Sequence, residues 1–559
     1  MAKRAFSSTL RSPSPVLAKK PRTDAAVVQN KIATAEAAAR KGDAVVYWMR
    51  MEDMRISDNR ALHQASEQAK KEDVPLLVLF TISPQDYAAH DRSPRRIDFT
   101  LRNLRCLQAS LVEELFVPLH IVVCNRRRSL PGEVISLIKN WNCRRLYANI
   151  EYEVDELRRD IEICQLAKEQ GIVPVFIHDK LVVPPGKLFT KQGKPYTVYS
   201  PWQRQWVSEL NAHRDVYLAE SPRPSANSES LRKHPTFGPL FDTPVPDFIP
   251  NFECVDREVM AKTWPASQAA ARQILDQFLH TKSRNTHVGN SDPLEPGAEW
   301  SDKRSRGLVY KDNRDKADRD HTSRLSPYLS AGVISARELI RATMNAMGSK
   351  TVEANRNTSL GVWVMEIAWR DFYTHVMAAF PRVSMGRPFQ EKYAAVKWET
   401  DEVKLQAWKD GRTGVPIVDA AMRQANTMGW MHNRSRMISA MFLCKDLMID
   451  WRLGERYFMQ QFVDGDLANN NGGWQWSAST GTDPQPYFRI MNPYLQSEKA
   501  DPTGDYIRAF VEELKDVRGP EIHNPTAKIC ERTGYPRPIV DHKAVRERAL
   551  RRYKEPGVE

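Results

Sequence analysis

The chain has 559 residues, more than one compact core usually holds, so its length predicts two domains and the linkers that join them. Hydrophobic residues make up 41% of the chain and charged residues 27%, the balance of an ordinary globular protein. The longest apolar stretch, residues 74–82, is far too short to span a bilayer, which argues against membrane insertion. The net charge of +13 favours a polyanionic partner, although a basic protein without such a partner would show the same balance.

Seven cysteines are scattered along the chain, an odd number with no CxxC pair. They form no Cys/His cluster with the spacing of a zinc site, so no metal site is expected. We interpret them as reduced thiols of an intracellular protein.

The N-terminal segment is basic and rich in serine and proline. Residues 1–23 contain six Lys or Arg and no acidic residue, a composition that favours disorder. An early Lys-Arg pair, followed after a spacer by Lys-Lys-Pro-Arg at 19–22, is typical of a two-part nuclear import signal. A basic, acid-free terminus also suits a mitochondrial presequence, but Pro13 and Pro15 would interrupt the amphipathic helix of such a signal. We therefore expect residues 1–42 to be a disordered tail that targets the nucleus, with the mitochondrion left open.

Short apolar runs rich in Val, Ile and Leu follow this tail, at residues 44–48, 76–80, 119–123, 145–150 and 173–177. Longer amphipathic segments separate them, such as 97–115 and 154–169. This alternation predicts a parallel sheet flanked by helices, so residues 43–180 are expected to form a Rossmann-like α/β domain. The first run is followed by Arg-Met-Glu-Asp at 50–53 and not by a GxGxxG loop, which argues against a dehydrogenase.

Residues 181–266 contain many prolines and no clear period, and we expect a connector that wraps over the surface of a domain. From residue 267 to about residue 517 the spacing of apolar residues is helical, without alternating β-branched runs. We expect residues 267–545 to form an all-helical domain, followed by a short C-terminal tail at 546–559.

The helical half contains eight of the fourteen tryptophans between Trp363 and Trp476, although any single one of them is most simply a core residue. In the apolar segment 359–373, Glu366 shares a helix face with Trp369 and Arg370. A Glu-Arg pair at this spacing is usually a solvated surface pair. Here its neighbours are too apolar for that, and an unpaired buried carboxylate costs several kcal/mol, so Glu366 is expected to line a polar pocket.

Two further segments have the composition of a ligand site. Residues 464–476 combine two Asp, three Asn and three Gly with two tryptophans, which suits close approach to a polar heterocycle. A plain turn-rich loop is the alternative, and the tryptophan pair argues against it. Thr322, Ser323 and Arg324 come just before a helical stretch, where backbone N–H groups and hydroxyls bind phosphate well. A simple helix cap would look the same.

Together these segments resemble the cryptochrome/photolyase family over residues 43–545, through the motifs at 322–326, 430–434 and 464–476. The resemblance is closest to the class I members that repair cyclobutane pyrimidine dimers. It implies an α/β domain that carries an antenna pigment and a helical domain that binds FAD. Light-driven electron transfer from reduced FAD would then split a dimer that has flipped out of the DNA. We expect a monomer.

The resemblance assigns the flavin site to Tyr310, Thr322, Ser323, Arg324, Leu325, Ser326, Trp363, Arg370, Asp464, Gly465, Asp466 and Asn470. It places Asn470 opposite flavin N5, where an amide neither carries charge nor readily donates a proton and so supports an anionic reduced flavin. It also matches Trp398, Trp451 and Trp474 to an electron-transfer series that runs from the surface to the flavin. We interpret Trp408 and Trp430 as packing residues.

For damaged DNA, the resemblance implies Arg314, Glu366, Trp369, Tyr373, Asn433, Arg434, Met437, Trp476, Arg489 and Gln496. Trp369 and Trp476 would stack on the dimer, and Glu366 and Asn433 would bind the pyrimidine edges. The arginines and Gln496 would contact the backbone around the lesion without reading sequence.

Three related functions are less favoured. The (6-4) photolyases and animal cryptochromes carry a histidine pair where this chain has Asn433 and Met437. Signalling cryptochromes commonly add a long C-terminal tail, whereas this chain ends soon after the family region. Cryptochromes of the DASH type are not expected to carry the pair formed by Trp474 and Trp476. An unrelated flavin oxidoreductase would need a nicotinamide site, and we find no motif for one.

The antenna of this family is either methenyltetrahydrofolate or a deazaflavin. Residues 152–156 resemble the folate-binding strip, which implies that Asp155 and Glu156 accept hydrogen bonds from the pterin. Folate-binding bacterial members have a Lys where this chain has Met385. We expect 5,10-methenyltetrahydrofolate, weakly held, with 8-hydroxy-5-deazaflavin as the alternative.

Overall fold

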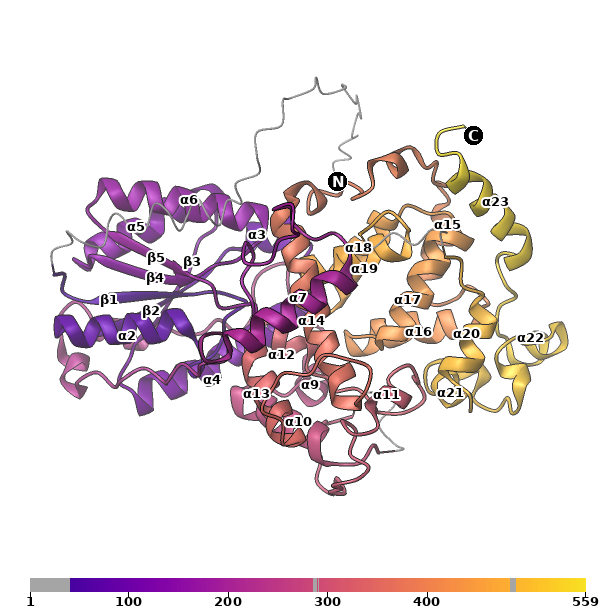
Figure 1. The fold of residues 1–559 in the computed structure, drawn as a ribbon, viewed down its shortest axis with the longest axis horizontal. Helices are drawn as coiled ribbons and strands as arrows, with labels where there is room; N and C mark the ends of the chain where they lie inside the picture. The colour runs from indigo at the N-terminus through magenta and orange to yellow at the C-terminus, as the bar shows by residue number, and fades with distance from the viewer. Residues whose placement is uncertain (1–40, 285–288, 290, 483–488, 559) are drawn as a thin grey trace.

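The computed structural model describes residues 41–284, 289, 291–482 and 489–558. Nearly all of the expected targeting tail at 1–42 lies outside these residues. Figure 1 shows an α/β unit on one side of the molecule and a helical unit on the other. Within the described ranges, every helix is too short or too polar to cross a membrane.

The α/β unit is built on a parallel sheet with the strand order β3-β2-β1-β4-β5. Its strands are β1 (Val45–Met49), β2 (Leu76–Ile82), β3 (Leu119–Val123), β4 (Arg145–Asn149) and β5 (Val173–Ile177). In the central strand, Tyr47 pairs with Val78 of β2 and with Tyr147 of β4. The apolar runs in the sequence predicted all five strands and the parallel arrangement, which is confirmed.

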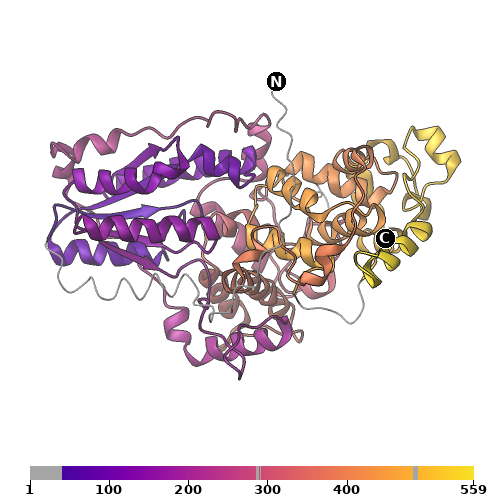
Figure 2. The same cartoon turned by 90° about the horizontal axis from the view of Figure 1, so that it is seen from above.

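Helices cover both faces of this sheet (Figures 1 and 2), namely α2 (Arg60–Glu72), α3 (Pro84–Ala89), α4 (Pro94–Ala109), α5 (Leu130–Asn140) and α6 (Val154–Glu169). Val45, Tyr47 and Met49 share one core with α2 and α4. Val46 and Trp48 point to the opposite face and share a second core with α5 and α6. β1 is therefore buried on both faces, which explains its continuous apolar sequence.

The second unit is helical, as predicted. Its helices are α9 (Arg257–Thr263), α10 (Gln268–His280), α11 (Tyr310–Asn313), α12 (Ser326–Ser330), α13 (Ala336–Met347), α14 (Ser359–Ala379), α15 (Glu402–Lys409), α16 (Pro416–Met428), α17 (Asn433–Met441), α18 (Trp451–Gln461), α19 (Leu467–Ser477), α20 (Pro493–Ala500), α21 (Asp505–Phe510), α22 (Ala527–Thr533) and α23 (His542–Lys554). The long α14 lies where the two units meet (Figure 1).

The segment expected to be an irregular connector, residues 181–266, contains α7 (Tyr199–Ala212), α8 (Arg214–Tyr217) and also α9, so that expectation was wrong in part. Trp202 and Trp206, one turn apart on α7, are buried against α14. The indole N–H of Trp206 donates to Asp371 at 3.1 Å. The prolines misled the interpretation because Pro201 lies in the first turn, where a helix tolerates proline.

The structure also differs from the C-terminal tail expected at 546–559, because α23 continues past residue 545 to Lys554. Tyr553 on this helix is buried, and its hydroxyl donates to the backbone oxygen of Ala478 at 2.6 Å. Its ring meets Trp398 edge to face, with 6.3 Å between the centroids. Most of the expected tail is therefore an integral part of the helical unit.

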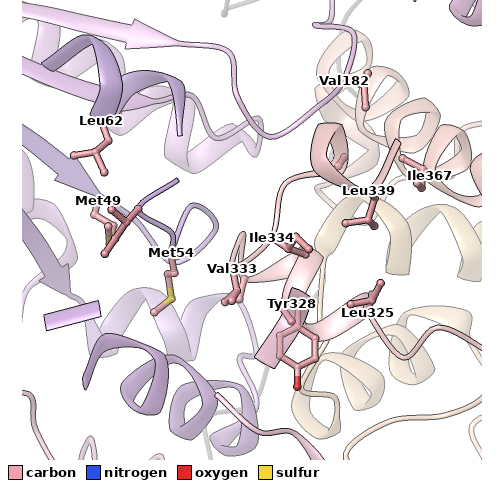
Figure 3. Packing of buried hydrophobic residues seen from close by; sticks show 14 of the residues in the cluster. Met49, Met54, Leu62, Val182, Leu325, Tyr328, Val333, Ile334, Leu339 and Ile367 are labelled. Carbon is pink, nitrogen blue, oxygen red and sulfur yellow. The ribbon is translucent and has the colours of Figure 1, made fainter. Parts of the chain in front are cut away.

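The two units share one apolar core. Figure 3 shows Met49, Met54 and Leu62 of the α/β unit near residues of the helical unit such as Val333 and Ile334, and all belong to the same buried cluster. Because association of apolar surface is a main source of folding free energy, the units stabilise each other.

At the boundary of the units, Gly332 has a φ of 64°, and a Cβ there would lie 1.9 Å from the carbonyl oxygen of Glu52. Gly348 has a similar φ of 61°, but no described atom lies within 4 Å of its Cβ position. We expect Gly332→Ala to lower the free energy of unfolding by about 1–3 kcal/mol more than Gly348→Ala, because both strain the backbone but only the first overpacks an interface. Denaturant unfolding of both variants measures the difference. Equal losses would contradict this account of Gly332.

Candidate functional site

One cavity of about 1000 Å³ opens in the helical unit. Its walls include residues of α7, α14, α17, α18, α19 and the segment that leads into α12. The volume lies at the upper end of the range for small-molecule sites, and the lining mixes aromatic, charged and amide side chains. The cavity therefore has room for a large, polar and partly aromatic ligand.

Every residue that the sequence assigned to the flavin lines this cavity: Tyr310, Thr322, Ser323, Arg324, Leu325, Ser326, Trp363, Arg370, Asp464, Gly465, Asp466 and Asn470. They come from separate parts of the chain, and the fold brings them together. Local sequence patterns alone do not predict that these residues lie next to one another.

The Asn-rich segment is a helix, α19, and not the turn-rich loop that its composition suggested. Asp466 begins the helix, because its side chain accepts a hydrogen bond from the backbone N–H of Asn469 at 2.9 Å. Gly472 faces α14, where a Cβ would lie 2.2 Å from the ring of Tyr373. This glycine therefore allows two helices to pack closely, and the expectation that it admits a ligand was wrong. Gly465 and Gly473 do line the cavity.

Two carboxylates of the cavity wall are held by cations. Arg436 donates to Oδ2 of Asp464 at 2.7 Å, while no described residue hydrogen-bonds to the buried Oδ1. Lys180 lies 3.3 Å from Oδ2 of Asp466. Burial by itself raises the pKa of Asp466, but Lys180 and Arg370 outweigh it and hold that pKa well below its ordinary value. Asp466 therefore stays ionised.

The lining residues fit a flavin nucleotide. The free Oδ1 of Asp464 suits an N–H donor of a heterocycle, and the hydroxyls of Thr322 and Ser323 beside Arg324 suit a phosphate. Trp363 adds an aromatic surface. Within the described ranges, no cluster of three or more His, Cys, Asp or Glu side chains is placed to hold a metal ion.

Glu366 forms an ion pair with Arg314 and not with Arg370, although Arg370 follows it by four residues. Arg370 instead donates to the backbone oxygen of Lys180 at 2.9 Å. Burial raises the pKa of the Glu366 carboxyl, and the neighbouring Arg314 opposes this shift. Glu366 and Arg314 thus place a paired carboxylate and cation on the cavity wall.

Two tryptophans give this cavity flat surfaces. Trp369 is stacked on Tyr199, with 3.5 Å between ring centroids, and Tyr373 lies beside it at 5.5 Å. Trp476 has the guanidinium of Arg489 5.4 Å from its ring centroid. Stacking surfaces beside a cation suit a nucleobase next to its phosphate.

The other residues predicted to contact DNA divide into two groups. Asn433 and Met437, one turn apart on α17, line the cavity. Arg434 and Gln496 are not among its lining residues. Arg434 pairs with Asp315 at 2.7 Å, and Gln496 lies half-buried on α20. A DNA contact for these two stays a prediction.

The three tryptophans of the expected electron-transfer series lie in or against one apolar cluster. Trp474 lines the cavity and is buried, and Gly454 on α18 makes room for its ring, since a Cβ there would lie 2.1 Å away. Trp451 begins α18 and is buried as well, whereas Trp398 is half-buried. The series therefore includes one member at the cavity and one that reaches the surface.

The residues expected to bind the antenna lie in the first turn of α6. Asp155 accepts a hydrogen bond from Arg127 at 2.5 Å, and Glu156 lies 3.2 Å from Nε2 of His90. Burial and the nearby Glu151 raise the pKa of Glu156 to about 7, and burial lowers the pKa of His90 to about 4. The Glu156 carboxyl therefore takes up a proton more readily than an exposed glutamate, and in its protonated form it donates as well as accepts hydrogen bonds.

Among the cavity-lining residues that sequence reasoning missed, three make contact with residues of the predicted site. Tyr199, which stacks on Trp369, belongs to the segment that was expected to be a connector. Arg436 holds Asp464, and the motif at 430–434 ends only two residues before it. Trp430 was interpreted as packing, but it lines the cavity and its indole N–H donates to Oγ of Ser326 at 3.1 Å. Only its place in the motif could have suggested this.

Comparison with known proteins assigns the chain to a family. A family described as DNA photolyase matches residues 45–225, and the FAD binding domain of DNA photolyase matches residues 363–555. The deoxyribodipyrimidine photo-lyase of Neurospora crassa is 41% identical over 91% of this chain and 81% of its own length. The mitochondrial deoxyribodipyrimidine photo-lyase of Saccharomyces cerevisiae is 32% identical over 91% of this chain and 86% of its own length.

A solved structure leads to the same assignment. The crystal structure of a bacterial class III photolyase from Agrobacterium tumefaciens is similar with a TM-score of 0.73 and 30% sequence identity. The similarity covers 93% of this chain and 99% of that one. On the grounds of its fold, its sequence relatives and its solved neighbour, this chain belongs to the DNA photolyase family.

Proposed function

We propose that this protein is a deoxyribodipyrimidine photo-lyase, which binds FAD and uses light to split cyclobutane pyrimidine dimers in DNA. One observation carries this proposal: a single cavity contains both the residues matched to the flavin and the paired tryptophans matched to the lesion. The relatives that bear this enzyme name cover 91% of the chain, and the net charge of +13 suits a DNA substrate.

The helical unit would hold FAD through Asp464, Arg324, Asn470 and the hydroxyls of Thr322 and Ser323. When bound in its reduced form, FAD supplies a photoexcited electron donor. The side-chain N–H of Asn470 donates to the backbone oxygen of Glu455 at 2.9 Å, which fixes the amide and leaves its oxygen for another partner. An amide is uncharged and does not readily give up a proton, so Asn470 would support an anionic reduced flavin.

The chain's own residues would receive the lesion. A dimer already disturbs base stacking, so its extrusion from the duplex costs less than that of an intact base. Trp369 and Trp476 would stack on the extruded dimer, and Glu366 would bind a pyrimidine edge while Arg314 keeps its carboxylate paired. Arg489, beside Trp476, would contact the backbone, where cations position DNA without reading sequence.

The lesion would be a cyclobutane dimer and not a (6-4) product. Asn433 and Met437 line the cavity at the positions where relatives that act on (6-4) products were expected to carry two histidines. Without these histidines, the described residues of that wall offer no imidazole acid–base pair. Neutral side chains there are sufficient for a reaction that is driven by electron transfer.

Illumination of the purified protein tests this function. Reduced protein is mixed with DNA that contains a single cyclobutane dimer and exposed to blue light, with a dark sample and (6-4) photoproduct DNA as controls. We expect the dimer to disappear only in the light and the (6-4) product to persist. Loss of dimers in the dark, or repair of the (6-4) product alone, would refute the proposal.

The antenna is proposed to be 5,10-methenyltetrahydrofolate, bound weakly near Asp155 and Glu156, with 8-hydroxy-5-deazaflavin as the alternative. Met385 is 64% exposed, and its side chain is uncharged. This position therefore cannot form an ion pair with a folate. Met385→Lys should therefore raise folate affinity by roughly twofold to fivefold, the effect of one exposed ion pair. Folate titration followed by absorption measures this, with Val403→Lys, at another exposed apolar position, as the control.

Two results would overturn the antenna assignment. Stoichiometric deazaflavin in the purified protein would identify the other pigment. Folate affinity that does not respond to Met385→Lys, or that responds equally to Val403→Lys, would remove position 385 from the site.

We also propose that the protein acts as a monomer and is sent to the nucleus, with the mitochondrion as a second destination. The basic composition of residues 1–42 supports nuclear targeting, and the yeast relative is named as mitochondrial. Light scattering of the purified protein and the location of a fluorescent protein fused after residue 42 test these two proposals. A stable dimer, or a fusion that stays in the cytosol, would refute them.

A further inference from the structure

Cations of the α/β unit hold the segment 463–466, which leads into α19. Three of its four residues are bound in this way: Arg96 donates to the backbone oxygen of Val463 at 3.1 Å, Arg92 donates to the backbone oxygen of Gly465 at 3.1 Å, and Lys180 lies 3.3 Å from the carboxylate of Asp466. The unit that was expected only to carry a pigment therefore contacts the wall of the flavin cavity.

Lys180 is the centre of this contact. Its ammonium lies 2.6 Å from Glu52, 3.2 Å from Glu153 and 3.3 Å from Asp466, and all four side chains are buried. Lys180, Glu52 and Glu153 follow β5, β1 and β4, and so lie at the carboxyl ends of the strands, where open α/β sheets usually bind a ligand. In this protein the same place holds an ion cluster that reaches into the other unit.

Asp466 transmits the position of Lys180 to α19. One carboxylate oxygen of Asp466 accepts from the N–H of Asn469 and so caps the helix, while the other faces Lys180. The helix that begins here carries Asn470, Trp474 and Trp476, all of which line the cavity. Neither Lys180 nor Arg92 lines the cavity. The side-chain contacts of both residues reach it through the segment 463–466, and the backbone oxygen of Lys180 also accepts from Arg370 of the cavity wall.

We propose that Lys180 and Arg92 are positioning residues of the flavin site, through which the α/β unit sets the place of Asp466 and α19 and the strength of FAD binding, whether or not that unit carries a pigment. This inference rests on the FAD binding proposed above. Without the ammonium, the carboxylates of Glu52, Glu153 and Asp466 would face one another in a buried cluster. They could relieve the repulsion only by taking up protons or by moving apart, and either change would disturb the cap of α19.

Lys180→Met keeps the length of the side chain and removes its charge. We expect the dissociation constant for FAD to rise at least about tenfold, because an unpaired buried charge is costly, and the visible absorption bands of bound FAD to shift. Lys180→Arg, which keeps the charge, should restore most of the affinity. Titration of apoprotein with FAD, followed by flavin fluorescence, measures the constant, and the absorption spectrum is recorded on the same samples.

Arg341→Met is the matched control. Arg341 also joins the two units through a partly buried ion pair, with Asp58 at 3.0 Å, but it contacts neither the segment 463–466 nor Lys180 in any described interaction. We expect this variant to lower the melting temperature and to leave the FAD dissociation constant and the absorption bands unchanged.

An unchanged dissociation constant and spectrum in a folded Lys180→Met variant would overturn the inference, and so would an equal loss of affinity in Arg341→Met. If Lys180→Met does not fold, Arg92→Met decides the matter, because it removes only one bond to the segment. That variant should bind FAD about threefold or more weakly, and unchanged affinity would overturn the inference. Failure of the wild-type protein to bind FAD would instead refute the proposed function.

Discussion

Replacement of Trp474 by Phe should abolish the photoreduction of oxidised FAD while leaving dimer repair by already reduced enzyme intact. Trp474 is the member of its tryptophan series that lines the cavity, so it would be the immediate electron donor to the flavin. Phenylalanine fills much of the space beside Gly454 but is far harder to oxidise than indole, so the electron supply would stop at this step. Illumination without oxygen and with an external reductant, followed by absorption, measures photoreduction.

Trp408→Phe is the control for this experiment. Trp408 is buried, belongs to the same apolar cluster and touches Trp474 edge to face at 6.0 Å, but it does not line the cavity. Photoreduction should survive in this variant. Chemically reduced Trp474→Phe enzyme is then tested on dimer DNA, and a complete loss of repair would contradict the separation of electron supply from repair.

The double variant Trp369→Ala/Trp476→Ala should bind dimer-containing DNA much more weakly than the wild-type protein. Stacking of a base on an aromatic side chain is worth about 1–3 kcal/mol, so each single substitution should cost that amount. The two residues are expected to hold the same lesion, so their effects need not add. Fluorescence anisotropy of labelled DNA in the dark, at one fixed salt concentration, measures the affinities.

Two comparisons show whether the loss is specific. Trp300 is 58% exposed and stacks on His280 outside the cavity, so Trp300→Ala makes the same chemical change without removing a lesion contact. It should leave the affinity unchanged. Undamaged DNA, held mainly through its phosphates, should bind the double variant as tightly as it binds the wild-type protein. An undiminished affinity of the double variant for damaged DNA would remove both tryptophans from the lesion site.

Local patterns were sufficient for the α/β unit but not for every helix. The strands were predictable because each contains a short apolar run, and the central strand β1 is buried on both faces. α7 was missed because the many prolines of residues 181–266 suggested a loop, while its buried surface depends on contacts with α14 that no local pattern reveals. α19 was missed because it is rich in Asn and Gly, and it becomes helical through the cap at Asp466 and close packing at Gly472.

For the cavity, the sequence predicted residue types better than their partners. Glu366 was expected in a polar pocket and lies in one, but its cation is Arg314 on a distant part of the chain and not Arg370 nearby. The ion pair of Asp464 with Arg436 was likewise invisible, because such pairs depend on how helices pack. The flavin and lesion roles of these residues came from family resemblance, and the cavity brings most of them together.

The apolar core common to both units constrains how proteins of this architecture can diversify. One buried cluster contains Met49 and Met54 of the α/β unit together with Val333 and Ile334 of the helical unit. Neither unit can therefore be replaced without changing the core of the other. Replacing the α/β unit with an unrelated domain would remove part of the apolar core of the helical unit. We would therefore expect proteins of this architecture to gain, change or lose a pigment through substitutions of single side chains, while the fold stays the same.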